Sequence, residues 1–244
     1  MGPMEAPLPE PAANEPAPGV PPRNGPTILP MFPIGSVLLP TAVLPLHIFE
    51  PRYRLMIRHC LDGNRSFGVV LIARGSEVGG GEERTDLGTV AQVVGATELT
   101  DGRWYVVALG TQRLRVLRWL ADDPYPRAEV VEWSDNPAHQ PARAEDYAQL
   151  VTDARRLLAL AAEAGEQVAE VTTEFADDPA LGSFQIAAAL PLGAFDRQRV
   201  LATDSSAARC ALVGRLCAER AGDLQALLAM GSGEPDAGSG PDPI

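Results

Sequence analysis

The spacing of hydrophobic residues changes character about halfway along the chain. From residue 27 to about 134, hydrophobic positions form short runs rich in Val, Ile and Leu, separated by turn signals. From about 135 to 230, they recur every three or four residues among Ala, Arg and acidic residues. The first pattern is typical of β-strands and the second of amphipathic helices. We therefore predict an α+β fold in which a strand-rich part precedes a helical part.

Six segments of the first part have strand character. Residues 67–73 are almost entirely apolar, as in a strand that is buried on both faces. Pro45 places the segment 43–49 at a sheet edge or a bulge, and Asp101-Gly102 is a tight-turn signal between two long segments. The predicted strands are 28–32, 43–49, 67–73, 88–99, 103–119 and 125–133.

Five segments have helical character. The first begins at Pro51, which suits the first helical position, and ends at Gly63. Its apolar residues fall on one face at the spacing i, i+3, i+4, i+7 and i+8. Pro191 ends the third segment, and Asp204 is placed to cap the last one. The four later helices are predicted at 144–164, 183–189, 193–201 and 205–230.

The two ends of the chain differ in composition from the part between them. Residues 1–26 are rich in Pro, Ala and Glu, and residues 231–244 in Gly, Pro and Asp. Such segments bury too little apolar surface to become ordered, so we predict two disordered tails. Between them we expect a β-rich lobe at 27–134 and a helical lobe of the same domain at 135–230.

The charged residues exclude several kinds of chemistry. The 20 basic residues are all Arg, and with 32 acidic residues the net charge of the 244-residue chain is -12. Without Lys the chain cannot supply a P-loop lysine, a Schiff base or a Ser-Lys dyad. A phosphate backbone would be repelled on average, so a nucleic acid is not the expected partner.

The remaining residues do not form a recognisable catalytic or metal-binding pattern. The three cysteines, Cys60, Cys210 and Cys217, are too sparse for a disulfide framework and indicate a reducing cytoplasm. The chain begins without a signal-peptide pattern, and its apolar runs are too short for a membrane span. We predict no catalytic residue, metal ion or cofactor, and therefore a protein that is not an enzyme.

One charged cluster stands out where the second strand meets the first helix. It comprises His47, Phe49, Glu50, Pro51, Arg52 and Tyr53. Glu50 is at the N-cap position, where the helix dipole favours a carboxylate, and Arg52 lies in the first turn, where it needs a partner. We predict a partly buried His47 and a corner held by ion pairs, with a ligand site as the alternative.

The same cluster carries a family resemblance. The segment LPMFPIGSVLLPTAVLPLHIFEPRYRLMIRHCLDGNRSFGVVLI, and then DGRWYVVALGTQRLRV and LPLGAFDRQRVLATDSSAARCALVGRLCAERAGDLQALL, resemble the N-terminal, substrate-binding domain of Lon proteases, in its stand-alone bacterial form. The likeness extends over almost all of residues 27–230. It implies a PUA-like pseudo-barrel of strands followed by a helical bundle, and a role in recognising polypeptides for a protease.

The function that we expect is the non-enzymatic recognition of unfolded or hydrophobic polypeptide segments, with a separate protease as a further partner. Apolar burial and edge-strand pairing suffice for such binding. The candidate contact residues are Tyr53, Trp104, Arg113 and Trp119. The alternative is an RNA- or small-ligand-binding PUA-like protein, which the local stripe Arg113, Arg115 and Arg118 would favour.

The composition of the tails makes a first prediction. Removal of residues 1–26 and 231–244 should leave the melting temperature unchanged, because the tails cannot offset an ordering entropy of roughly 1–2 kcal/mol per residue. Thermal unfolding followed by circular dichroism measures this. A decrease of many degrees would show that a tail packs against the domain.

Overall fold

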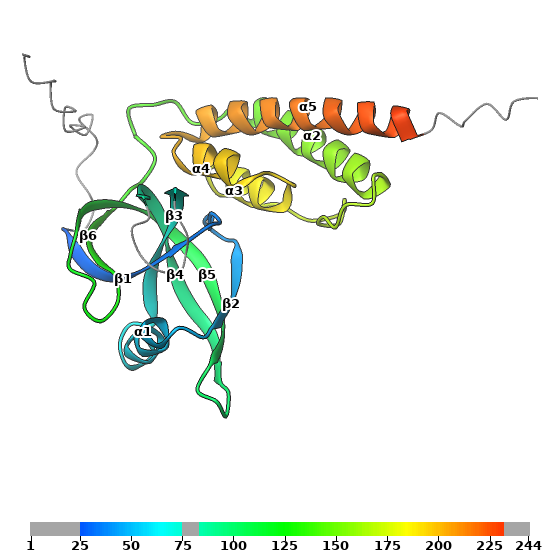
Figure 1. Ribbon diagram of the computed structural model, residues 1–244. Helices are drawn as coiled ribbons and strands as arrows, with labels where there is room; N and C mark the ends of the chain where they lie inside the picture. The colour runs from blue at the N-terminus through cyan, green and yellow to red at the C-terminus, as the bar shows by residue number, and fades with distance from the viewer. Residues whose placement is uncertain (1–24, 75–82, 232–244) are drawn as a thin grey trace, which may run out of the picture.

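The computed structural model describes residues 25–74 and 83–231, which form a β lobe and a helical lobe (Figure 1). The strands are β1 (Thr27–Ile34), β2 (Val43–Ile48), β3 (Ser66–Arg74), β4 (Glu83–Glu98), β5 (Trp104–Trp119) and β6 (Arg127–Glu132). The helices are α1 (Pro51–Asp62), α2 (Ala144–Glu163), α3 (Pro179–Ala189), α4 (Ala194–Leu201) and α5 (Ser206–Gly231). The predicted α+β class is confirmed, and the predicted tails fall almost wholly outside the described residues.

The six strands form one mixed sheet that rolls into an incomplete barrel. Their order is β2-β5-β4-β3-β1-β6, and a further pairing between β5 and β6 closes the roll. The pairing of β1 with β3 is parallel, and the other pairings are antiparallel. The long strand β5 pairs with β2 through Trp104–Leu109 and with β6 through Leu114–Trp119. The barrel is consequently closed beside β6 and open beside β2.

The change of partner along β5 takes place around Gly110. Here the loop between β1 and β2 crosses β5, and the Thr41 amide donates to the Gly110 carbonyl at 2.7 Å. The crossing is so close that a Cβ atom on Gly110 would lie 2.4 Å from the carbonyl oxygen of Leu39. A residue without a side chain is therefore required where β5 passes under the loop.

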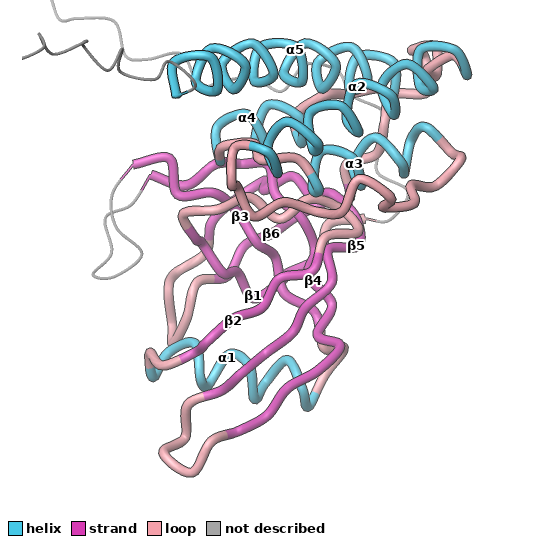
Figure 2. The backbone as a smooth tube through the Cα atoms, turned by 90° about the vertical axis from the view of Figure 1, so that its right-hand side faces the viewer, coloured by secondary structure: helices cyan, strands magenta, loops and turns pink. Residues whose placement is uncertain are grey.

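Helix α1 covers one end of the barrel, as the tube in Figure 2 shows. The apolar face predicted from its spacing is confirmed, because Tyr53, Met56, Ile57 and Cys60 are all buried. These side chains join the inward-facing residues of the strands in one core. The strand residues of this core include Phe32, Ile48, Phe67, Val69, Ala91, Val93, Trp104, Val106 and Ala108.

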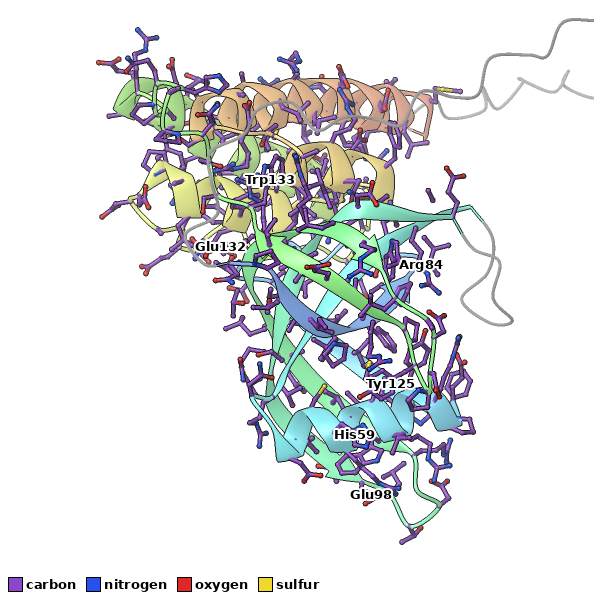
Figure 3. The ribbon with its side chains drawn as sticks, turned by 90° about the vertical axis from the view of Figure 1, so that its left-hand side faces the viewer. His59, Arg84, Glu98, Tyr125, Glu132 and Trp133 are labelled. Carbon is purple, nitrogen blue, oxygen red and sulfur yellow. The ribbon has the colours of Figure 1, made fainter. Side chains whose placement is uncertain are left out.

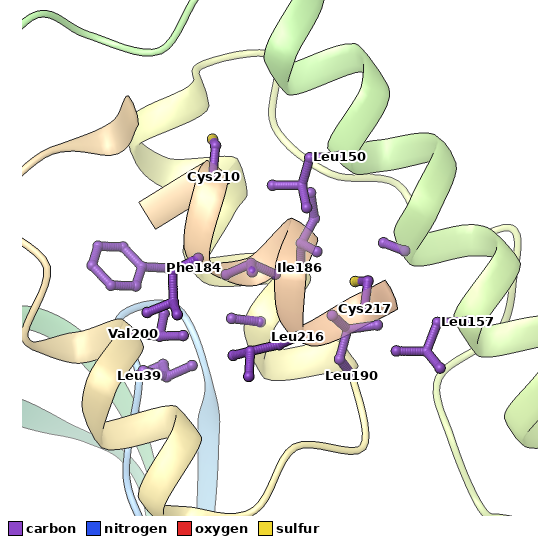
Figure 4. Close-up of a cluster of buried hydrophobic side chains, with 14 of the residues drawn as sticks. Leu39, Leu150, Leu157, Phe184, Ile186, Leu190, Val200, Cys210, Leu216 and Cys217 are labelled. Carbon is purple, nitrogen blue, oxygen red and sulfur yellow. The ribbon is translucent and has the colours of Figure 1, made fainter. Parts of the chain in front are cut away.

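The helical lobe has its own core, to which the β lobe contributes. Leu150, Leu157, Phe184 and Leu216 are among the helical side chains that pack together there (Figure 4). Val37 and Leu39, from the loop between β1 and β2, and Leu71 of β3 belong to the same cluster. The two lobes are therefore held together by packed apolar side chains as well as by the covalent connection between them.

Helix α3 begins four residues earlier than the predicted start at 183. Asp178 caps it by accepting a hydrogen bond from the Ala180 amide at 3.0 Å, and Pro179 is its first residue. The first turn of α3 was not predicted because it contains Gly182, and glycine disfavours helix formation. The structure needs it there, since a Cβ atom would lie 1.8 Å from the Tyr147 hydroxyl of α2.

The junction between the lobes contains a buried ionic network. Arg209 of α5 is fully buried and donates to both carboxylate oxygens of Asp135 at 3.0 Å. Arg113 of β5 bonds the same carboxylate and donates to the Leu201 carbonyl at 3.0 Å. Both guanidinium groups also lie over the ring of Phe184, Arg209 at 3.8 Å and Arg113 at 5.4 Å.

Two buried cations thus share one carboxylate, which is itself 29% exposed. Burial and the neighbouring Arg209 lower the pKa of Arg113 to about 10, and Asp135 opposes that shift. Arg113 therefore remains charged at neutral pH. Removing one member of a buried ionic group leaves the others uncompensated, which typically costs about 3–5 kcal/mol.

Asp135→Ala should accordingly reduce the free energy of unfolding by roughly 3–5 kcal/mol, because Arg113 and Arg209 would lose their shared anion. Denaturation in urea measures the change. Asp146→Ala is the matched control, since within residues 25–74 and 83–231 Asp146 forms its ion pair with the exposed Arg143 at 2.9 Å, and such pairs contribute about 0–1 kcal/mol. Equal effects of the two substitutions would contradict the role given to the network.

Candidate functional site

A cavity of about 240 Å³ lies where the barrel is open, between β1, β2 and the beginning of α1. Most of the residues that line it have apolar side chains, with Ser36, His47 and Glu50 as the polar members, and the exposed lining is of mixed polarity. The apolar lining residues are Phe32, Ile34, Leu44, Pro45, Leu46, Ile48, Phe49 and Tyr53. The cavity can accept an apolar side chain of a partner, with polar contacts available around it.

Strand β2 borders this cavity with an edge that has no strand beside it in the described part of the chain. Gly110 donates to the carbonyl of Ala42 at 2.9 Å, and bonded pairs alternate along an antiparallel ladder. Leu44, Leu46 and Ile48 consequently bond to β5, while the backbone groups of the residues between them face the open edge. The predicted edge position of Pro45 is confirmed.

The outer face of β2 and β5 is hydrophobic next to this edge. Val43, Tyr105 and Val107 are exposed there, and Phe49 at the end of β2 is 55% exposed. The ring of His47 stacks on that of Tyr105 with centroids 4.8 Å apart. The prediction of a partly buried His47 is wrong, because alternation along β2 turns its side chain outward.

The predicted ion pair at the corner after β2 is confirmed, but the side chain of Glu50 does not cap the helix. Glu50 occupies the N-cap position of α1, but its side chain makes no capping hydrogen bond. It instead accepts a hydrogen bond from Nε of Arg52 at 3.0 Å, and the Arg52 guanidinium lies 4.6 Å from the Tyr53 ring centroid. The ion pair therefore fixes the two charged side chains at the rim of the cavity and leaves the helix start to Pro51.

The four predicted contact residues are not brought together. Tyr53 lines the cavity but is only 4% exposed, and Trp104 is 8% exposed in the barrel core. Arg113 is 5% exposed in the junction between the lobes. Trp119 lies at the far end of β5, under the guanidinium of Arg84 at 4.5 Å. Tyr53, Trp104 and Arg113 are buried and therefore offer a peptide little surface.

The residues of this site that the sequence did not single out are Val43, Leu46, Tyr105 and Val107. Their alternation was visible, but only the register of β2 on β5 shows which of them share a face. Pro45 lies opposite Val107 and His47 opposite Tyr105. Cross-strand neighbours of this kind are specified by pairing, which the spacing within one strand does not reveal.

The arginine stripe of β5 does not form a continuous cationic surface. Arg113 is turned inward, Arg115 lies against the ring of Trp133 at 5.1 Å, and Arg118 bonds Glu129 at 3.0 Å. Trp133 itself is situated at the junction of the two lobes (Figure 3). The stripe that favoured the RNA alternative is therefore divided between separate environments.

The three thiols are free and buried. The Cys60 thiol points to the carbonyl of Ser66, whereas the neighbouring His59 ring turns to the Tyr125 hydroxyl, 2.9 Å away (Figure 3). Burial raises the pKa of Cys60 to about 11 and that of Cys217 to about 12. Across the ranges that the structure describes, no group of His, Cys, Asp and Glu is placed to hold a metal ion, and no helix could cross a membrane.

Comparison with known proteins identifies relatives of the whole domain. Residues 28–218 match the family model of the ATP-dependent protease La (LON) substrate-binding domain. A Lon protease of Anaeromyxobacter dehalogenans is 28% identical over 191 residues, which are 77% of this chain and 22% of that protein. A LON peptidase N-terminal domain and RING finger protein of Schizosaccharomyces pombe is 31% identical over 121 residues, 45% of this chain and 25% of that protein. The chain thus spans about a quarter of the length of these relatives.

Solved structures show the same architecture. A Lon N-terminal domain protein from Xanthomonas campestris has a TM-score of 0.57 and 29% identity, covering 83% of this chain and 98% of that one. The N-terminal domain of a Lon protease of the Mycobacterium avium complex has a TM-score of 0.55 at 19% identity, covering 81% and 99%. The second likeness concerns the fold alone.

The buried thiols predict low reactivity in the folded protein. At pH 8, a thiol reagent such as dithionitrobenzoate should label Cys60 and Cys217 far more slowly in native buffer than in guanidinium chloride. Because folding raises both pKa values above the ordinary 9.0, stability should be greatest below pH 9 and fall as the pH rises towards 11. Rapid labelling of either residue in the native state would contradict the burial described here.

Proposed function

The chain belongs to the LON substrate-binding domain family, and from this premise we propose that it recognises polypeptide segments of other proteins without altering them chemically. The observation that supports the proposal best is the open edge of β2 beside a cavity lined mostly by residues with apolar side chains. An extended peptide can add itself to such an edge as a further strand. The backbone then supplies affinity, and the cavity supplies selectivity.

The geometry of β2 determines which side chains of a bound peptide would contact the cavity. Side chains alternate between the two faces of a strand. Every second residue of an added strand would face inward, beside Leu44, Leu46 and Ile48, towards the cavity. The others would extend the exposed row formed by Val43 and His47. The preferred ligand is therefore an extended segment with apolar residues at alternate positions.

The size of the cavity supports a side chain as its occupant. At about 240 Å³ it is smaller than the roughly 300–1,000 Å³ that is usual for small-molecule and cofactor sites. A side chain held there would contact Phe32, Ile34 and Leu46. The partner that presents such a side chain is an unfolded or misfolded protein, in which apolar residues that are normally buried are accessible.

Recognition would not require ATP or peptide-bond cleavage by this domain. The sequence contains no Lys, and the family match is to a substrate-binding domain. We propose that any degradation of the bound protein is carried out by a protease module outside these 244 residues. All three cysteines are free and buried, and the reducing cytoplasm is the compartment that we propose.

Substitution of Phe49 tests the site. Phe49 borders the cavity and is 55% exposed, so Phe49→Ser should leave stability nearly unchanged while weakening binding by roughly 10- to 100-fold, the equivalent of burying one large side chain. The probe is fluorescein-labelled, reduced and carboxymethylated lactalbumin, followed by fluorescence anisotropy. Phe195→Ser is the matched control, because Phe195 is 75% exposed on α4 in the other lobe.

Salt dependence separates this function from RNA binding. Affinity for the unfolded probe should change little between about 50 and 200 mM salt, whereas a complex with 6–10 phosphate contacts loses about 10³–10⁵ in affinity. If Phe49→Ser and Phe195→Ser lost equal affinity for the unfolded probe, the probe would not bind at the cavity. Steeply salt-dependent binding of an RNA probe, with no response to the unfolded protein, would overturn the proposal.

A further inference from the structure

The open edge of β2 is accessible to a second copy of the chain as well as to a client polypeptide. A two-fold axis brings two identical strands together in antiparallel orientation. An exposed edge flanked by apolar side chains, such as Val43 and Val107, is the kind of surface through which sheets associate with one another. Client recognition at this edge therefore needs a feature that discriminates against self-pairing.

Pro45 is central among the residues whose backbone faces the open edge, which are Val43, Pro45 and His47. A two-fold pairing that engages all three sets Val43 opposite the second copy's His47 and each Pro45 opposite the other. The two residues of such a bonded pair normally exchange two N–H···O bonds. Proline has no N–H, so the central pair forms neither bond. Each proline ring also occupies the place of the missing hydrogen, against the opposite carbonyl.

Other registers of self-pairing do not avoid this obstacle. A shift by two residues sets Pro45 opposite Val43 or His47 of the second copy, and it does so twice because of the symmetry. Each of these pairs retains one bond of two, and fewer residues of β2 are engaged. The proline therefore weakens every register that uses the middle of the strand.

A client polypeptide meets a different situation. It encounters a single Pro45, whose carbonyl accepts an N–H of the client, and it pairs normally with Val43 and His47 on either side. The cost of the missing N–H occurs once, and no second ring opposes the first. The same residue that blocks symmetric pairing is thus compatible with an asymmetric ligand.

We infer that Pro45 is a specificity-determining residue, which reserves the β2 edge for client polypeptides by preventing two copies of the chain from pairing there. This inference rests on the proposed function. Pro45 suits an experimental change because its side chain is exposed at the rim of the cavity and because the register on β5 leaves its backbone at the open edge. A residue with an N–H can replace it without altering the barrel core.

The test compares Pro45→Val with the unchanged chain by sedimentation equilibrium. Two regained hydrogen bonds should tighten dimerisation by roughly 10- to 100-fold. Pro45→Thr restores the same N–H with a more polar side chain and should dimerise as well, which separates edge pairing from hydrophobic association. Val107→Thr is the control, since Val107 lies opposite Pro45 in a strand paired on both sides. Circular dichroism establishes that each variant is folded.

The results distinguish the inference from the function on which it rests. Folded Pro45→Val and Pro45→Thr chains that dimerise no more tightly than the unchanged chain would show the inference to be wrong. Dimerisation of Val107→Thr as tight as that of the two Pro45 variants would show that self-association does not depend on Pro45, and it would overturn the inference too. The labelled lactalbumin probe should dissociate the Pro45→Val dimer, and a dimer that binds the probe as well as the monomer does would also contradict the inference. Failure of the unchanged chain to bind the probe would instead refute the proposed function.

Discussion

The pairing of β5 with two different strands determines both how the barrel closes and where it stays open. Its second half bonds β6 and completes the roll, while its first half bonds β2, beyond which no strand follows in the described chain. Gly110 makes the change of partner possible because the loop carrying Leu39 passes so close to it. The open edge and the cavity beside it are consequences of this single long strand.

The same strand also connects the barrel to the helices. Just beyond Gly110, Arg113 turns inward and shares Asp135 with Arg209. Asp135 belongs to the linker between β6 and α2 (residues 133–143), so three distant parts of the sequence meet at one carboxylate. Replacing an ionic group of this kind by well-packed apolar side chains is often neutral or stabilising in proteins. The effect of this ionic group is geometric, since it requires β5, the linker and α5 to adopt one arrangement.

The sequence contained the elements of the fold but not their relations in space. Runs such as 67–73 and the apolar face of α1 were predictable because burial imposes a period on each element by itself. The start of α3 was missed because its first turn contains Gly182, a poor helix former. The glycine is there because Tyr147 of α2 packs too close for a side chain at this position. The prediction of the contact residues was wrong for a similar reason. Tyr53, Trp104 and Arg113 have the residue types expected of contacts, and only the register of the sheet shows that they face inward.

The loop between β1 and β2 has a consequence for how this protein unfolds. Ser36 lines the cavity, and the next residue, Val37, packs in the core of the helical lobe together with Leu39. The change in composition at the linker therefore does not mark a boundary between cooperative units. Separating the lobes would expose Val37 and Leu39 and leave Arg113 without its anion, so barrel and helices should open in one transition. The loop that helps to line the cavity is thus held by Val37 and Leu39, two core residues that do not line the cavity themselves.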